Sequence, residues 1–310
     1  MLDISSRQNL SSAALLTVVY ADIFDYPLTA VEIHRYLTGV SASLDEVIRA
    51  LDADGFFTRI GSYFTLPGRE AIVPIRLQRE ARARALLPRA LKYGRVLGSL
   101  PFVRMVALTG SLAVMNVTET ADFDYLLVTQ PGRLWTARAF AVTFGRLMRP
   151  LGDTLCVNLL LSENALAWPH HDLYSAREIC QMIPITGINV YHRLRAANAW
   201  TESILPNSTF SAPTLEQISV DDETNQTQRL LELPLRGPVG TRLERWAMNF
   251  QISRIARRWG RGEETQFSGD VCQSNFHDHR QSTQEAFERR LLSIESPLPF
   301  TLSGDEVARG

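Results

Sequence analysis

The chain has few cysteines and no long apolar run. Its 310 residues include only Cys156, Cys180 and Cys272, which are odd in number and far apart, so they predict neither a disulfide framework nor a Cys-x-x-Cys metal site. No segment reaches about 18 uninterrupted apolar residues, and the polar N-terminus lacks the basic and apolar order of a secretion signal. These absences predict a cytoplasmic protein with no membrane span.

The chain also lacks an excess of charge of either sign. Its formal net charge is -1, which excludes a basic coat over the whole surface, so any contact with nucleic acid would have to come from local patches. Apolar residues make up 45% of the sequence and charged residues 21%, as in ordinary globular proteins. A chain of this length can form two or three modules, each with its own core.

A glycine-serine turn after an apolar run is the first motif that carries chemistry. The run from Val103 to Leu108 is typical of a buried strand, and Thr109, Gly110 and Ser111 end it. We expect a short helix over Leu112 to Asn116. Backbone N–H groups of the turn and the Ser111 hydroxyl would then face an incoming phosphate.

An Asp-x-Asp strand follows ten residues later. The segment Asp122 to Thr129 reads as a strand, in which alternation places Asp122 and Asp124 on one face and Phe123 on the other. Magnesium prefers carboxylate and phosphate oxygens, so the two aspartates beside a phosphate-binding turn predict a site for Mg²⁺ or Mn²⁺. The plainer alternative is a turn between two core strands with solvent-facing aspartates.

The stretch VALTGSLAVMNVTETADFDYLLVT resembles the signature of the polymerase-β-like nucleotidyltransferase superfamily. Segments 131–138, 155–163, 173–184 and 196–207 extend the resemblance to a bacterial group of nucleotidyltransferase-domain proteins. It implies an α/β (α+β) fold in which Gly110 and Ser111 bind a nucleoside triphosphate and Asp122 and Asp124 bind divalent metal. In that superfamily a third carboxylate, on a later strand, helps to activate the acceptor hydroxyl.

The third carboxylate is where this chain departs from the pattern. The strand expected at Thr154 to Leu161 carries Asn158 as its only central polar residue. An amide can orient a hydroxyl, but it neither balances a second metal nor accepts a proton. Asp153 and Glu163, at the two ends of the strand, are possible substitutes.

Residues 1–68 have the pattern of a winged helix-turn-helix. We expect three helices, over Ser12 to Phe24, from Thr29, and over Leu44 to Ala53, with capping boxes at Thr29 with Glu32 and at Ser43 with Glu46. Two short strands, at 56–60 and 63–66, flank a Gly61-Ser62 turn. From Ser11 to Leu66 there are seven acidic residues against three arginines, and this charge argues against DNA binding by the module.

The following segment, Arg69 to Arg95, is predicted to be a long basic helix. Its seven arginines and one lysine face two glutamates. They would either line the approach to a triphosphate or an RNA, or pack as an arginine face against the acidic module. Arg133 and Arg138, after the Asp-x-Asp strand, are weaker candidates for phosphate contact, and the alternative is that they are surface arginines.

The remaining boundaries follow from composition. A nucleotidyltransferase-like domain is predicted over 69–205, with an apolar helical pattern from Ala165 to Ile204, followed by a Ser, Thr, Asn and Asp-rich linker at 206–228. The region 229–310 is predicted to be helical. Its amphipathic basic helix, Val239 to Trp259, would pack on the domain, contact RNA or lie on a membrane surface.

The sequence therefore predicts transfer of a nucleoside monophosphate from an NTP to a hydroxyl acceptor, which is RNA, a protein or a small molecule. The catalytic residues would be Asp122, Asp124 and Asn158. Nucleotide contacts would come from Gly110, Ser111 and Arg133. The alternative is a catalytically silent NTP-binding regulator whose winged helix contacts DNA or a protein partner.

Overall fold

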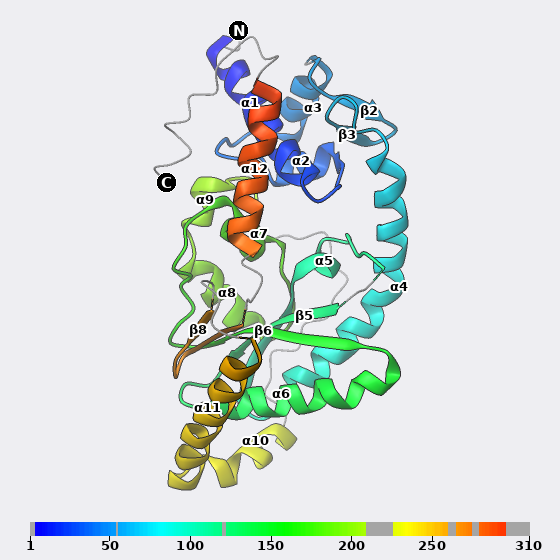
Figure 1. The fold of residues 1–310 in the computed structure, drawn as a ribbon. Helices are drawn as coiled ribbons and strands as arrows, with labels where there is room; N and C mark the ends of the chain where they lie inside the picture. Colours follow the sequence, from blue (N-terminus) through cyan, green and yellow to red (C-terminus); the bar gives the residue numbers. More distant parts are fainter. Residues whose placement is uncertain are drawn as a thin grey trace.

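The structure is a computed structural model that describes residues 4–53, 55–119, 122–208, 226–259, 265–274 and 279–295. It contains helices and two sheets, and the predicted mixed α/β class is confirmed. The smaller sheet belongs to the N-terminal module (residues 4–66), and the larger one forms the middle of the molecule (Figure 1).

The N-terminal module consists of three helices and three short strands. They are α1 (Ile4–Asp22), β1 (Leu28–Thr29), α2 (Ala30–Arg35), α3 (Leu44–Ala53), β2 (Thr58–Ile60) and β3 (Tyr63–Thr65). Both predicted capping boxes are confirmed: Thr29 and Glu32 exchange hydrogen bonds at the start of α2, and Ser43 and Glu46 do so at the start of α3. The β2–β3 hairpin is confirmed too, and β1 adds to its other edge in the order β1-β3-β2.

The large sheet has six strands in the order β7-β4-β5-β6-β9-β8. They are β4 (Val103–Leu108), β5 (Asp122–Thr129), β6 (Thr154–Ser162), β7 (Ile183–Thr186), β8 (Thr265–Phe267) and β9 (Val271–Ser274). Among the described strands of this sheet, β5 and β6 pair in parallel and the other neighbours are antiparallel. The sequence predicted β4, β5 and β6 but neither β7 nor β8 and β9, because these short strands lie inside segments that read as helical.

Helices cover both faces of this sheet. One face packs against α4 (Ile72–Gly98), α6 (Leu134–Met148) and α11 (Pro238–Trp259), and the other against α7 (Leu173–Gln181) and α8 (Ile188–Ala197). Alternation along β5 sends Phe123 and Tyr125 into the first core and Leu126 and Val128 into the second. The shorter elements are α5 (Gly110–Ala113), η1 (Arg149–Leu151), α9 (Thr201–Ile204), α10 (Gln226–Glu232) and η3 (Leu233–Leu235).

The basic helix α4 runs along the side of the molecule from the module to the sheet (Figure 1). Its arginines pair with the acidic module: Arg76 bonds Glu32 at 2.6 Å, and Arg69, just before the helix, bonds Asp22 at 2.8 Å. Arg79 donates to the Phe24 carbonyl. These contacts favour packing over the polyanion role that was the alternative for this segment.

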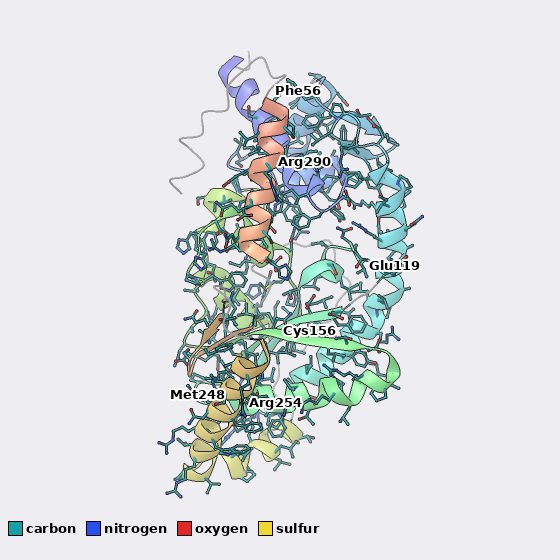
Figure 2. All side chains as sticks on the ribbon, in the orientation of Figure 1. Phe56, Glu119, Cys156, Met248, Arg254 and Arg290 are labelled. Atoms are coloured by element: carbon teal, nitrogen blue, oxygen red, sulfur yellow. The ribbon has the colours of Figure 1, made fainter. Side chains whose placement is uncertain are left out.

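The C-terminal region returns to both parts of the molecule. Glu244 of α11 accepts hydrogen bonds from the backbone N–H groups of Trp135 and Thr136 at the start of α6. The last helix, α12 (His279–Glu295), lies against the module, where Arg290 pairs with Asp22 at 2.9 Å (Figure 2). Most of the predicted linker, residues 209–225, and the segment after 295 lie outside the described residues.

Within the described ranges, none of the helices combines the length and the apolar character that crossing a membrane would require.

Candidate active site

The glycine-serine turn connects β4 to β5 through a position that only glycine fits. Gly110 has φ +65°, and a Cβ at this residue would lie 2.6 Å from Oδ2 of Asp124. The Thr109 N–H donates to the Asp124 carbonyl at 2.9 Å, which fixes the turn against β5. The helix after the turn, α5, begins at Gly110 and ends at Ala113, so it starts earlier and is shorter than predicted.

Asn158 reaches Asp124 because β6 has a bulge. Tyr125 pairs with Val157 and Leu126 with Leu159, so Asn158 is the extra residue between the two pairs. Its Nδ2 donates to Oδ1 of Asp124 at 3.1 Å. The residue predicted at the third-carboxylate position therefore does contact the Asp-x-Asp motif.

The surroundings of Asp124 disfavour its negative charge. Burial raises the pKa of Asp124 to about 7, and the charges of Asp122 and Glu178 add to the effect. The neighbouring Cys156 donates its thiol to Oδ2 of Asp122 at 3.6 Å. Burial and the two aspartates raise the pKa of that thiol to about 12, so Cys156 stays a neutral donor (Figure 2 labels it on β6).

A cavity of about 880 Å³ opens over this motif. Gly110, Ser111, Asp124 and Asn158 all line it, so the structure brings these four predicted residues together. Asp122 is exposed at the start of β5, next to the cavity but outside its lining. The other walls come from the N-terminal module, the segment between β6 and α7, α7 itself, β8, β9 and α12.

The module is tied to the loop that follows the glycine-serine turn. The Tyr26 hydroxyl donates to the Val114 carbonyl at 2.8 Å, and the Asn116 side chain donates to the Phe24 carbonyl at 3.1 Å. Arg79 of α4 donates to both Phe24 and Asn116. The module is therefore a fixed wall of the cavity, held by the same loop that shapes the turn.

Glu178 of α7 is a cavity residue that the sequence analysis missed. It lines the cavity with Tyr174 and Gln181, which lie on the same helix face. Burial raises the pKa of Glu178 to about 7, and among the described residues it has no cationic partner. The sequence did offer one signal for Glu178, since it is an acidic residue within a segment whose apolar residues have helical spacing.

The two substitutes considered for the third carboxylate are engaged elsewhere. Asp153 is buried, where it accepts a hydrogen bond from the Tyr93 hydroxyl at 2.7 Å and pairs with Arg89 at 3.1 Å. Glu163 pairs with Arg193. Neither residue lines the cavity.

Arg133 lies beyond the opposite end of β5 and is not brought to the cavity. Its guanidinium donates to the carbonyls of Gly132 and Arg236 and lies 5.7 Å from the centre of the Phe102 ring. Arg138 bonds the side chain of Gln251 at 2.8 Å. Both arginines connect α6 to the C-terminal region.

The part of the chain that the structure describes contains no group of three or more His, Cys, Asp or Glu side chains arranged to hold a metal ion. A metal ion at Asp122 and Asp124 would therefore take its other ligands from a bound phosphate or water. Comparisons of the chain with protein-family models, with curated proteins and with solved structures found no match.

Proposed function

We propose that this protein is a metal-dependent nucleotidyltransferase of the polymerase-β-like type, which moves a nucleoside monophosphate from an NTP to a hydroxyl acceptor. One observation carries the proposal. The carboxylate of Asp124 has no cationic partner among the described residues and packs against the Gly110 turn at the wall of a large cavity. A carboxylate held in this way is stabilised by a cation that arrives with the ligand.

The residues around Asp124 suit a divalent cation carried by a triphosphate. Asp122 and Asp124 would hold Mg²⁺ or Mn²⁺, and the N–H groups and hydroxyl of Gly110 and Ser111 would bind the β and γ phosphates. When bound, the metal supplies positive charge for the phosphoryl oxygens in the transition state. Asn158 keeps Oδ1 of Asp124 oriented through its 3.1 Å hydrogen bond.

Glu178 is the residue that could replace the missing third carboxylate. The acceptor hydroxyl oxygen forms a bond to the α-phosphorus as the bond from that phosphorus to the bridging oxygen breaks, and pyrophosphate leaves. The hydroxyl proton passes to the carboxylate of Glu178. A base whose pKa is raised to about 7 by burial is well matched to this step near neutral pH.

The N-terminal module, in this proposal, is a winged helix that encloses the site and does not read DNA. Acidic residues of the module form ion pairs with arginines: Asp22 pairs with Arg69, and Glu32 pairs with Arg76. On α3, Asp45 is exposed to solvent and its charge would repel phosphates.

Calorimetric titration with ATP, GTP, CTP and UTP in the presence of Mg²⁺ or Mn²⁺ tests the proposal. We expect metal-dependent binding of at least one NTP by the wild type and its loss in the double variant Asp122→Asn, Asp124→Asn. Glu163→Gln removes a carboxylate from the same sheet outside the cavity and should bind like wild type. Absence of NTP binding by the wild type would refute the proposal.

Asn158 itself favours the second candidate, a regulator that binds NTP without catalysis, because an amide cannot act as a base. The two candidates separate on Glu178→Gln, assayed with labelled NTP and a mixture of RNA and protein acceptors. Transfer by the wild type that falls by about 10²-fold or more in this variant, with NTP affinity preserved, supports the enzyme. Binding without any transfer by the wild type supports the regulator.

A further inference from the structure

Two arginines on the cavity wall form no ion pair with any carboxylate of the described residues. Arg177 of α7 is 2% exposed, and its guanidinium lies 4.9 Å from the centre of the Tyr20 ring and 4.5 Å from that of the Tyr36 ring. Its Nη2 donates a long hydrogen bond, 3.5 Å, to the Tyr36 carbonyl, and its Nε has no hydrogen-bond partner in the part of the chain that the structure describes. None of the ion pairs within the described ranges includes Arg177.

Arg35, at the end of α2, faces the same tyrosine. Its guanidinium lies 5.1 Å from the centre of the Tyr36 ring, and its Nη2 donates to the Cys180 carbonyl at 3.2 Å. Its buried Nε has no partner either, and no described carboxylate forms an ion pair with it. Both arginines line the cavity, and they come from elements far apart in the sequence.

These charges differ from that of Arg76, which is buried in the same part of the molecule. Arg76 is 5% exposed, and Glu32 neutralises it at 2.6 Å. Burying a cation without an anion is costly, and for Arg177 this shows as a pKa lowered by burial. The nearby rings recover part of that cost through cation–π contact, but they supply no anion.

Glu178 is the nearest candidate for an internal counter-ion, because it follows Arg177 in the chain. Consecutive residues on a helix point about 100° apart and do not face each other. In the structure the two side chains form no ion pair. The cavity thus has carboxylates near the glycine-serine turn and guanidinium groups towards the N-terminal module.

We propose that Arg35 and Arg177 bind a phosphate group of the acceptor, which makes the acceptor a small phosphorylated alcohol. The inference rests on the proposed function for the identity of the reaction, but the anion site stands on the two arginines alone. Guanidinium groups recognise phosphate through paired charge-assisted hydrogen bonds, and two of them suit its double negative charge. The cavity of about 880 Å³ that both arginines line is in the upper range of small-molecule pockets.

The test is calorimetric titration with inorganic phosphate in the absence of metal, with acetate as the carboxylate probe. Wild type should bind phosphate more tightly than acetate. Arg35→Gln and Arg177→Gln should each weaken phosphate binding by about tenfold or more, and Arg177→Lys should weaken it less. Arg84→Gln, a matched change on the exposed face of α4, should leave binding unchanged.

The double variant Asp122→Asn, Asp124→Asn separates this inference from the proposed function. It should keep arginine-dependent phosphate binding while losing Mg²⁺-dependent NTP binding. A wild type that binds phosphate but no NTP would refute the proposed function and leave the anion site standing.

Arg177 is buried, so its variants are checked by circular dichroism and thermal melting. If Arg177→Gln does not fold, the phosphate affinity of Arg35→Gln tests the proposal. Arg35 is only partly buried, so we expect this variant to fold. No phosphate binding by folded wild type, or binding that folded Arg35→Gln leaves unchanged, would overturn the proposal. Acetate bound as tightly as phosphate would overturn the choice of phosphate.

Discussion

Two partly buried carboxylates, one in the N-terminal module and one in the cavity, have opposite electrostatic surroundings. Burial alone would raise the pKa of Glu32, but the hydrogen bonds and charge of Arg76 outweigh burial and hold that pKa below its usual value. Burial also raises the pKa of Asp124, and there the neighbouring charges of Asp122 and Glu178 raise it further. The cost of burying a carboxylate charge is therefore offset by Arg76 at Glu32, whereas the nearby negative charges increase that cost at Asp124.

The difference separates charge that is balanced within the fold from charge that no described cation balances. Glu32 caps α2, and its ion pair with Arg76 joins the module to α4. The charge of Glu32 therefore has a structural role. Asp124 and Glu178 line a cavity, and neither forms an ion pair with a described cation. Like charges gathered in a cavity are typical of sites that take up a cation or move a proton.

Breaking the balanced pair should have the largest effect on stability. Arg76→Met leaves Glu32 partly buried without its cation and removes the stacking of Arg76 on Tyr26, 4.0 Å from the ring centre. We expect the free energy of unfolding in urea to fall by about 3 kcal/mol. Arg84→Met, whose arginine is 71% exposed and pairs with Glu80, is the matched control and should change it by less than about 0.5 kcal/mol.

A second variant isolates the charge. Glu32→Gln combined with Arg76→Met removes both charges, so it should recover part of the loss. Equal destabilisation by the single and double variants would show that packing, and not the unpaired carboxylate, is responsible.

Removing the charge of Asp124 should increase the stability of the fold, whereas Arg76→Met should decrease it. With its pKa raised to about 7, Asp124 stays protonated in the folded protein up to about that pH, whereas the unfolded chain ionises at about pH 4. The fold therefore loses stability as the pH rises from about 4 to about 7, and the loss is complete above 7. Asp124→Asn should therefore stabilise the metal-free protein by about 2 kcal/mol at pH 8, after allowance for partial exposure. The gain should shrink as the pH falls from 7 towards 4, where the unfolded chain also becomes protonated.

Urea unfolding at pH 8 and pH 5 checks this prediction. Glu178→Gln should behave in the same direction, because burial raises the pKa of Glu178 to about 7 as well. Destabilisation by Asp124→Asn at pH 8 would contradict the electrostatic account of the cavity.

Local patterns predicted much of the fold and part of the site. The bounds of β4 and β5, the two capping boxes and the β2–β3 hairpin follow from spacing within a few residues, and the structure confirms them. The position of Gly110 next to Asp124 also follows from a local pattern, a glycine turn between two predicted strands.

The features that were missed depend on distant contacts. β7 contains Pro184 at the edge of the sheet, where the missing N–H is tolerated, but its pairing with β4 has no local signal. Glu178 and Arg177 come to the cavity only through the packing of α7, and the bulge that aims Asn158 depends on the register of β6. Arg133 was a phosphate candidate by proximity in sequence, yet β5 carries it away from the cavity.

The proposed function predicts that binding of metal and nucleotide depends on pH because of Asp124. A cation can bind its carboxylate only after the proton leaves, so affinity for the preferred Mg²⁺–NTP should fall about tenfold from pH 8 to pH 6. Titration calorimetry at both values measures this change. In Glu178→Gln, loss of one neighbouring charge lowers the pKa of Asp124, and the fall should be smaller; an equal fall in both proteins would assign the pH dependence to the nucleotide itself.

The smallest effect is expected where a pair is exposed. Asp52 and Arg59 lie 3.3 Å apart, but their side chains are 54% and 60% exposed, so water screens both charges. Asp52→Asn should change the free energy of unfolding by less than about 0.5 kcal/mol, equally at pH 5 and pH 8, as measured by urea unfolding. A loss near that of Arg76→Met would mean that pairing alone decides how much a carboxylate matters here. A negligible loss would leave burial as the cause of the contrast between Glu32 and Asp124. A carboxylate removed from water needs a cation beside it, either from the protein, as Arg76 is for Glu32, or from a bound ligand; an exposed carboxylate does not.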